Sequence, residues 1–468
     1  MVMPNPNPLS AASKSRIEKY VASAMRKNNL PGLSLCLVKD GEVVYARGFG
    51  SRSLEPPKPS TPETLYGIGS VSKAFTAVSV LKLAEQGKVA LEDPLNKYLP
   101  NFTADSGGSP VTVHQLLSHS SGFPDLGVAE EVIGKIFGMK TTWTPLGGVD
   151  DLLSLVNASS SERVSDKGDV FFYWNEGYAL LGALIEKVSG QTYPDFVRNN
   201  VLAPLKMTRS TFDRNELEKD EDSMTGYVPE KEGKRKPQKF PSHPLVDAAG
   251  GLMSSAKELS HFVTMCIDNG KFEGTQVIDS KLLSKAFTPH IRHSLPPAMV
   301  GGEFYGYGFI INKDFHGHTL IGHGGNVGVS SAYIGFIPEL RAGVSLVSNA
   351  DFGSDTPALY ALCVLCGIDP EKALISVAYE KRAEILKGRY ESSNGAHKMT
   401  ILEKVPVLSV EVGGEEGGAL ALPLILEGED VYILWGPERS KLRVDIHSPD
   451  KVDVFIERNV FHKVGKWP

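Results

Sequence analysis

The chain has 468 residues, 41% of them hydrophobic and 22% charged, with a formal net charge of -6. This composition excludes a disordered or fibrous protein, and the mildly acidic balance argues against a dedicated nucleic-acid-binding protein. No segment approaches 18 continuous apolar residues, and the first ten residues lack the basic and apolar regions of a signal peptide, so we expect neither a membrane anchor nor export. The four cysteines are few for this length, and we expect no disulfides and a cytoplasmic location.

The amino-terminal segment predicts a helix followed by a hairpin. Residues 11–29 carry apolar side chains at helical spacing and end before a Pro-Gly pair. Two β-rich runs, at 33–38 and 42–46, flank an Asp-Gly pair that is typical of tight hairpin turns. We expect the helix to cap a sheet.

The next segment places a serine and a lysine on one face of a helix. Ser70 and Lys73 stand three positions apart at the start of a helical pattern that runs through Leu81. A serine hydroxyl needs a nearby base to become a nucleophile, and a lysine becomes that base once its pKa is lowered by burial or by another cation. Ser72 is an alternative nucleophile, but it points away from the shared face. A surface helix capped by serine is the alternative without chemistry.

The middle of the chain alternates helices with polar segments. Residues 112–122 predict a short helix closed by glycine, and residues 123–170 predict a variable region of the kind that forms substrate walls. A long helical pattern then continues to residue 188, with Tyr173 and Asn175 at its entry.

Beyond residue 214 the predicted structure becomes mainly β. Residues 215–244 are highly charged and predict an exposed flap, which is followed by a helix through residues 259–265. Strand-like runs then recur between short turns containing Gly or Pro, which predicts an antiparallel meander rather than a parallel α/β sheet. These runs span residues 305–311, 318–321, 331–337 and 343–348.

The carboxy-terminal part predicts a separate β domain. A helical stretch over residues 357–385 connects to residues 387–468, where short strands alternate with turns as in a barrel or sandwich. The prediction is therefore an α+β domain over residues 1–386, with a helical subdomain at roughly 90–260, and an all-β domain over residues 387–468. The predicted strands of this second domain span residues 398–401, 408–412, 422–426, 431–434 and 452–456.

Three short motifs occur in order along the first predicted domain: Ser70-Val-Ser-Lys73, Tyr173-Trp174-Asn175 and His323-Gly324-Gly325. Together they resemble the Ser-x-x-Lys, Tyr-x-Asn and Lys/His-x-Gly motifs of the penicillin-recognising serine hydrolases, the class C β-lactamase-like group. The likeness covers residues 15–350 and implies an antiparallel sheet flanked by helices, the β-lactamase/transpeptidase-like fold. The second domain resembles the lipocalin-like barrels appended to relatives such as D-aminopeptidases.

The resemblance implies a covalent mechanism at Ser70. Ser70 attacks an acyl carbonyl, while Lys73 and Tyr173 share removal and return of the proton, and either of the two is a candidate base. Asn175 holds Lys73 or a substrate amide by hydrogen bonds. Trp174 is expected to contact a bulky substrate or acceptor.

The glycine-rich motif supplies the remaining expected site residues. The backbone N–H groups of Ser70 and Asn326 would form an oxyanion hole, and Gly324 and Gly325 allow the close approach of the two chain segments. His323 replaces the lysine of the true lactamases. This replacement argues against recognition of a β-lactam carboxylate and suits esters and amides.

A zinc site is an alternative use of the histidines, because His316 and His318 would share a strand face near His323. No acidic or cysteine partner accompanies them at ligand spacing, so we predict no metal and no cofactor. The chain also lacks the Gly-x-Ser-x-Gly elbow of an α/β-hydrolase.

Several functions fit these residues. The first is a serine hydrolase that cleaves a small-molecule ester, lactone or amide, without nucleic acid or membrane as a partner. The second is an acyltransferase or peptide cyclase that uses the same acyl-enzyme. A β-lactamase and a binding protein with a vestigial cleft are less favoured by the motifs.

Overall fold

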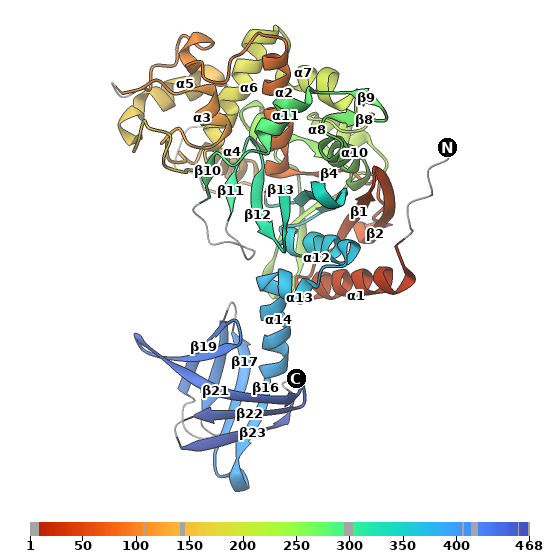
Figure 1. Cartoon of the computed structure of the whole chain (residues 1–468), viewed down its shortest axis with the longest axis vertical. Coiled ribbons are helices and arrows are strands. Elements are labelled where there is room, and N and C mark those ends of the chain that lie inside the picture. Colours follow the sequence, from red (N-terminus) through yellow and green to blue (C-terminus); the bar gives the residue numbers. More distant parts are fainter. Residues whose placement is uncertain are drawn as a thin grey trace. The chain divides into compact units, whose positions relative to one another are not determined.

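The computed structural model describes residues 9–105, 108–140, 146–293, 303–404, 407–412, 420–456 and 458–466. The chain forms two compact units, Met1–Asp369 and Pro370–Pro468 (Figure 1). The break between the two units therefore lies at residues 369–370, whereas the sequence analysis placed it at residues 386–387. The physical reason is that Ala383 and Leu386, on the helix before the barrel, pack in the hydrophobic core of the second unit.

An antiparallel sheet of nine strands forms the centre of the first unit, which confirms the predicted meander (Figure 1). Strand β1 lies between β2 and β15, with Leu35 opposite Arg47 on one side and Leu346 on the other. In spatial order the strands are β10 (Ile291–Arg292), β11 (Phe304–Tyr305), β12 (Ile310–Phe315), β13 (His318–Asn326), β14 (Ser331–Ile337), β15 (Ala342–Ser348), β1 (Gly32–Lys39), β2 (Glu42–Leu54) and β3 (Pro57–Pro59).

Helices cover both faces of this sheet. On one face, α10 packs against β1, β14 and β15, and Gly343 leaves room for Val263 and Ile267 of that helix. On the other face α12 packs on the same strands and α1 lies on α12, where the rings of Tyr20 and Tyr360 stack at 3.8 Å. These helices are α1 (Ala11–Lys27), α10 (Ala256–Ile267) and α12 (Asp355–Cys366).

The helical part of the first unit is built around α2 (Ser72–Glu85) and α6 (Asn175–Ser189), which pack against each other. Every side chain of α2 from Ser72 to Leu81 is buried, so this helix runs through the core rather than over a surface. Within the described ranges, no helix combines the length and the apolar composition needed to cross a membrane. The other helices are α3 (Val113–Leu117), α4 (Val128–Ile136), α5 (Val149–Ala158), α7 (Tyr193–Val197), α8 (Arg214–Lys219), α9 (Pro244–Val246) and α11 (Ser280–Ala286).

Three predicted elements differ from the structure. The expected strand at residues 305–311 is interrupted, because Gly308 adopts a φ of +73° where the chain presses against α2; a Cβ there would lie 2.7 Å from the Lys73 carbonyl oxygen. The helical stretch at 357–385 is three helices, since Gly367 ends α12 with a φ of +72°. The charged flap at 215–244 contains α8 and a hairpin. The short paired strands are β5 (Gly226–Pro229) with β6 (Arg235–Gln238), β4 (Tyr66–Gly67) with β7 (Met253–Ser254), and β8 (Lys271–Phe272) with β9 (Thr275–Gln276).

The second unit is a closed antiparallel barrel of eight strands, which confirms the predicted β-barrel (Figure 1). Three of its strands, β16, β21 and β23, were not predicted; in β21 most side chains are exposed and the apolar alternation is weak. The elements are α13 (Pro370–Ala373), α14 (Ile375–Leu386), β16 (Gly388–Ser392), β17 (Lys398–Lys404), β18 (Val407–Val412), β19 (Leu420–Glu427), β20 (Asp430–Trp435), β21 (Glu438–Ser448), β22 (Lys451–Ile456) and β23 (Asn459–Gly465).

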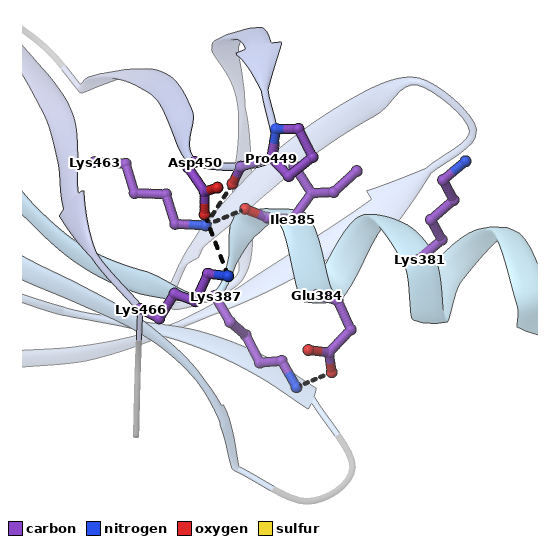
Figure 2. A pocket seen from close by; sticks show the side chains of 8 residues that line it. All are labelled: Lys381, Glu384, Ile385, Lys387, Pro449, Asp450, Lys463 and Lys466. Carbon is purple, nitrogen blue, oxygen red and sulfur yellow. Dashed lines mark hydrogen bonds and ion pairs between the residues drawn. The ribbon is translucent and has the colours of Figure 1, made fainter. Parts of the chain in front are cut away.

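A lysine-lined cavity of about 620 Å³ lies beside the carboxy-terminal end of α14 (Figure 2). Lys463 Nζ donates hydrogen bonds to the carbonyl oxygens of Ile385 and Pro449, at 2.7 and 3.0 Å, and Lys466 pairs with Asp450 at 3.4 Å. Helix carboxy-termini present unsatisfied carbonyls and a partial negative charge. Lys463 therefore stabilises the end of α14 on the barrel.

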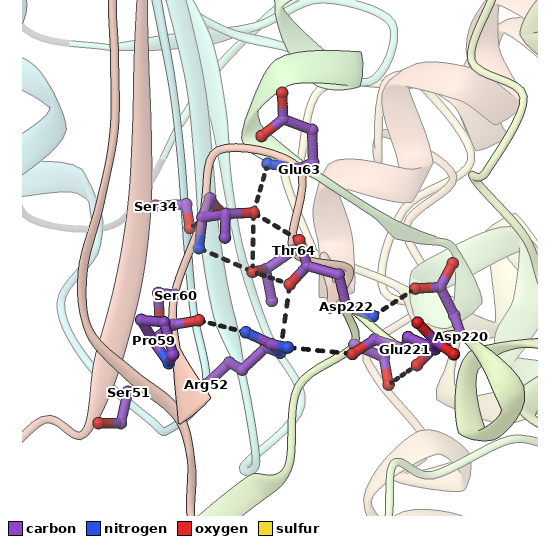
Figure 3. Close-up of polar contacts among 12 residues, drawn as sticks. Ser34, Ser51, Arg52, Pro59, Ser60, Glu63, Thr64, Asp220, Glu221 and Asp222 are labelled. Atoms are coloured by element: carbon purple, nitrogen blue, oxygen red, sulfur yellow. Dashed lines mark hydrogen bonds and ion pairs between the residues drawn. The ribbon is translucent and has the colours of Figure 1, made fainter. Parts of the chain in front are cut away.

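A carboxylate network holds the segment that leads to Ser70 (Figure 3). Thr61 and Thr64 each donate a hydrogen bond to Asp222 at 2.5 Å, and Arg52 Nε lies 3.2 Å from the same carboxylate. A parallel bridge between Leu65 and residue 223 continues the contact along the backbone. The network therefore ties the chain just before β4 to a segment distant in sequence.

Replacing Asp222 with Asn should destabilise the first unit, because one negative acceptor serves two hydroxyls and a guanidinium. Hydrogen bonds to charged groups contribute about 1.5–3 kcal/mol each, so we expect a clear fall in the melting temperature followed by circular dichroism. Glu221→Gln is the matched control, since this exposed neighbour takes part only through its backbone carbonyl. Equal losses in both variants would contradict the role given to the carboxylate.

Candidate active site

Ser70 lies in the 3-10 turn Gly69–Val71 that opens α2. Gly69 adopts a φ of +52°, and a Cβ there would lie 2.5 Å from the backbone nitrogen of Asn326. Both observations require glycine at this position. Because N–H groups in the first helical turn have no acceptor within the helix, the turn presents the Ser70 N–H as well as its hydroxyl.

Strand β13 approaches the Ser70 turn more closely than any side chain would allow. A Cβ on Gly325 would lie 2.0 Å from the Ile68 carbonyl oxygen and 2.8 Å from the Ser70 nitrogen. A Cβ on Gly324 would meet nothing nearer than 4.0 Å. The structure therefore brings the Ser70 turn beside Gly325 and Asn326, as the oxyanion-hole prediction requires.

The Lys73 side chain is fully buried and has three polar neighbours. Its Nζ lies 3.2 Å from Ser70 Oγ, 2.8 Å from Asn175 Oδ1 and 2.8 Å from the Ala249 carbonyl oxygen. Burial lowers the pKa of Lys73 to about 7, although nearby carboxylates act in the opposite direction. A substantial fraction of the amine is therefore unprotonated near neutral pH.

Tyr173 lies close to Lys73 and lines the same cavity as Ser70. Lys73 Nζ is 4.7 Å from the centre of its ring. Burial raises the pKa of the Tyr173 phenol, and the Ser70 hydroxyl lowers it only in part. The phenol is therefore protonated at neutral pH.

His119 holds the Tyr173 segment in place. Its Nδ1 accepts a hydrogen bond from the Trp174 backbone N–H at 3.0 Å, and its carbonyl oxygen accepts one from Phe172 at 3.0 Å. Its ring lies 4.4 Å from that of Tyr173. Burial lowers the pKa of His119 well below its usual value, so it acts as a neutral support.

Carboxylates orient Asn175 and the loop beside it. Asn175 Nδ2 donates to Asp125 at 3.1 Å, which leaves its Oδ1 for Lys73. The buried Glu176 accepts the Val128 N–H at 2.9 Å, and burial raises its pKa to about 7. These contacts fix the side-chain amide so that its oxygen faces the lysine.

His323 is a neutral imidazole in this structure. Burial, followed by the charge of Lys73, lowers its pKa to about 3. Its Nε2 lies 3.0 Å from the Tyr305 hydroxyl and its Nδ1 lies 2.5 Å from the Gly324 carbonyl oxygen. His323 thus supplies no positive charge where the true lactamases carry a lysine.

One cavity of about 500 Å³ connects most of the predicted site residues. It is lined by Ser70, Tyr173, His323, Gly324, Gly325 and Asn326. Lys73 does not line the cavity but contacts Ser70 by the hydrogen bond above, and Asn175 is connected to Ser70 through Lys73.

Two predicted residues lie elsewhere. Trp174 is 1% exposed, stacks on Phe123 at 5.0 Å and does not line the cavity, so the predicted contact with substrate is wrong. Neighbouring side chains of an extended segment point to opposite sides, so Trp174 points into the core while Tyr173 faces the cavity. The alternative nucleophile Ser72 is buried and accepts the Leu252 N–H at 3.1 Å.

The structure also identifies groups that the sequence analysis did not assign to the site. They are His119, Tyr305, Asp125 and the Ala249 carbonyl. His119 and Ala249 lie in two stretches that resemble the family, residues 116–122 and 247–253, and this was the available signal; Asp125 and Tyr305 had none. As for the histidines considered for zinc, the described residues contain no group of three or more His, Cys, Asp or Glu side chains placed to hold a metal.

The fold and the Ser-Lys-Tyr arrangement define a serine hydrolase of the β-lactamase and penicillin-binding type. The family model described as Beta-lactamase matches residues 17–362, and the chain belongs to this family. The octameric penicillin-binding protein homologue from Pyrococcus abyssi is 37% identical, with a TM-score of 0.86 over 96% of this chain and 100% of that one.

Two further relatives are more distant. A class C β-lactamase shares the fold, with a TM-score of 0.62 and 20% identity over 78% of this chain and 99% of that one. Protein flp from Staphylococcus aureus (strain N315) is 28% identical over 345 residues, 73% of this chain. The chain spans only 64% of the length of flp.

The contrast between the two glycines predicts different outcomes for one added methyl group. Gly325→Ala should destabilise the first unit by about 1–3 kcal/mol, the usual cost of overpacking, because its Cβ would collide with backbone atoms. Gly324→Ala is the matched control and should change the melting temperature little. Equal melting temperatures for the two variants would contradict the close contact between β13 and the Ser70 turn.

Proposed function

We propose that the protein is a serine hydrolase that forms a covalent acyl-Ser70 intermediate with a small ester, lactone or amide. The observation that carries this proposal is the set of contacts around Lys73. A neutral amine has two N–H donors and one lone pair. Asn175 and Ala249 each accept one donor at 2.8 Å, which leaves the lone pair for the Ser70 hydroxyl at 3.2 Å.

These contacts favour Lys73 over Tyr173 as the base. The pKa of Lys73 is lowered to about 7, whereas burial raises that of Tyr173, so the amine is the better proton acceptor at neutral pH. Lys73 takes the Ser70 proton as Oγ bonds to the carbonyl carbon. Tyr173, protonated and facing the cavity, donates a proton to the leaving oxygen or nitrogen and regains one from Lys73.

The charge that develops on the carbonyl oxygen needs hydrogen-bond donors. The backbone N–H groups of Ser70 and Asn326 are our proposed donors, because Gly69 and Gly325 bring the two segments together. Water then attacks the acyl-enzyme, with Lys73 or Tyr173 removing its proton. An amine or alcohol that replaces water in this step would make the same site an acyltransferase.

The absence of a positive charge at His323 supports esters and amides over β-lactams as substrates. A β-lactam carboxylate would find a neutral imidazole there. The four free cysteines, three of them buried, further support our proposal of a reducing compartment such as the cytoplasm.

Ser70→Ala should abolish both the hydrolysis of p-nitrophenyl esters and labelling by a fluorophosphonate. Ser79→Ala is the matched control, because Ser79 is a buried serine of the same helix that bonds only the Phe75 carbonyl, at 2.8 Å. Mass spectrometry of the labelled protein should locate the adduct on Ser70. Labelling that survives in Ser70→Ala would refute the proposed nucleophile.

The pH dependence should report the state of Lys73. Only the unprotonated amine accepts the serine proton, so kcat/KM should rise through about pH 7 and level off above it. Lys73→Arg should lose this activity at every pH, because a guanidinium stays protonated. An increase of kcat/KM as the pH falls through 7 would be inconsistent with a lysine base.

Product analysis separates hydrolysis from acyl transfer. With an added amine or alcohol, a hydrolase releases mainly the free acid, whereas a transferase partitions toward the acceptor even in dilute solution.

A further inference from the structure

The cavity that begins at Ser70 continues along β13 to two carboxylates. Glu303, just before β11, and Asp355, in the first turn of α12, both line it. The phenol of Tyr333 lines the same cavity, and its pKa is raised first by burial and then by the charges of Asp355 and Glu303. The hydroxyl packs against β13, where a Cβ on Gly322 would lie 2.6 Å from it.

Two polar groups in this part of the cavity have no hydrogen-bond partner among the residues that the structure describes. Tyr333 is 7% exposed, and no hydrogen bond joins its hydroxyl to another residue that the structure describes. The His293 side chain is also 7% exposed; its Nδ1 has no hydrogen-bond partner and lies 3.8 Å from Glu303, beyond hydrogen-bond distance. Buried polar groups are normally satisfied, so orphaned ones beside a cavity indicate a missing ligand.

The Asp, Glu, Lys and Arg side chains among the described residues that line the cavity are all acidic. Among the lining residues in the described part of the chain there are two carboxylates and no lysine or arginine. Lys73, which is buried beside Ser70, has its own acceptors. A ligand carboxylate entering this space would be repelled, whereas an ammonium group brings up to three N–H donors for the carboxylates and the phenol.

We propose that the Glu303–Tyr333–Asp355 end of the cavity binds a protonated amine of the substrate, so that the enzyme selects cationic esters or amides over neutral and anionic ones. This inference rests on the proposed function, because it assigns a substrate class to the cavity that Ser70 opens into. The aliphatic side chains of Ile310, Leu320 and Leu359 line the same cavity and suit an alkyl spacer between the amine and the reacting carbonyl.

Two matched ester series test the proposal. One places an ammonium group at the end of acyl chains of increasing length in p-nitrophenyl esters, and the other places it on the alcohol portion of acetate esters. Each is compared with the ester in which a methyl group replaces the ammonium, after correction for spontaneous hydrolysis. We expect at least one chain length to favour the cation by about tenfold or more in kcat/KM, which corresponds to about 1.4 kcal/mol.

Asp355→Asn and Glu303→Gln should each lower this cation-to-neutral ratio about tenfold, through KM, while the neutral ester reports whether the variant is folded and active. Asp314→Asn, which removes an exposed carboxylate outside the cavity, is the matched control and should keep the wild-type ratio. Unchanged ratios in both cavity variants, or no preference for the cation at any length, would overturn the proposal.

Binding to Ser70→Ala separates this inference from the proposed function. Calorimetry with the preferred amino ester and its neutral counterpart measures cation selectivity without turnover. Selective binding that is lost in the Ser70→Ala/Asp355→Asn double variant supports the amine site even if the wild-type protein hydrolyses no ester. Equal binding of the two esters refutes the amine site even if Ser70 is a working nucleophile.

Discussion

The burial of one amine is the constraint on which the site depends. Lys73 lies in a helix that runs through the core, so its Nζ loses water and its pKa falls to about 7. Buried polar groups must find partners, and Asn175 and Ala249 supply the two acceptors that a neutral amine needs. In the mechanism that we propose, the third direction, toward Ser70, is left for proton transfer. Asp125 in turn accepts a hydrogen bond from Asn175 and so holds its side-chain amide in one orientation.

The second constraint is the contact between β13 and the Ser70 turn. Gly69 and Gly325 let two backbones meet at distances that exclude any side chain. The same approach places His323 of β13 at the cavity, with Tyr305 as the partner of the imidazole. The electrostatic character of the cavity follows from the residues that line it, which are a neutral His323 in the same cavity as Ser70 and the carboxylates of Glu303 and Asp355.

Much of the architecture was readable from local patterns, because periodicity and turn residues act over short stretches. The long helices, the antiparallel meander and the β-barrel were predicted in this way, and the helix with Ser70 and Lys73 begins and ends close to where its spacing indicated. The errors arose where tertiary contacts override local preference. Packing against α2 breaks the strand at Gly308. Trp174 is buried because its neighbour Tyr173 points to the cavity and Trp174 therefore points the other way, into the core.

The sequence by itself determined the order and chemistry of the three motifs, because each is a short run whose residue types carry a specific reactivity. It did not determine how the groups between the motifs would meet. His119, Asp125, Tyr305 and Ala249 reach the site only through the fold, and the pKa of Lys73 depends on how deeply the helix is buried. Likewise, Glu303 and Asp355 are ordinary acidic residues in the sequence. Only the tertiary structure brings both carboxylates into the cavity that Ser70 also lines.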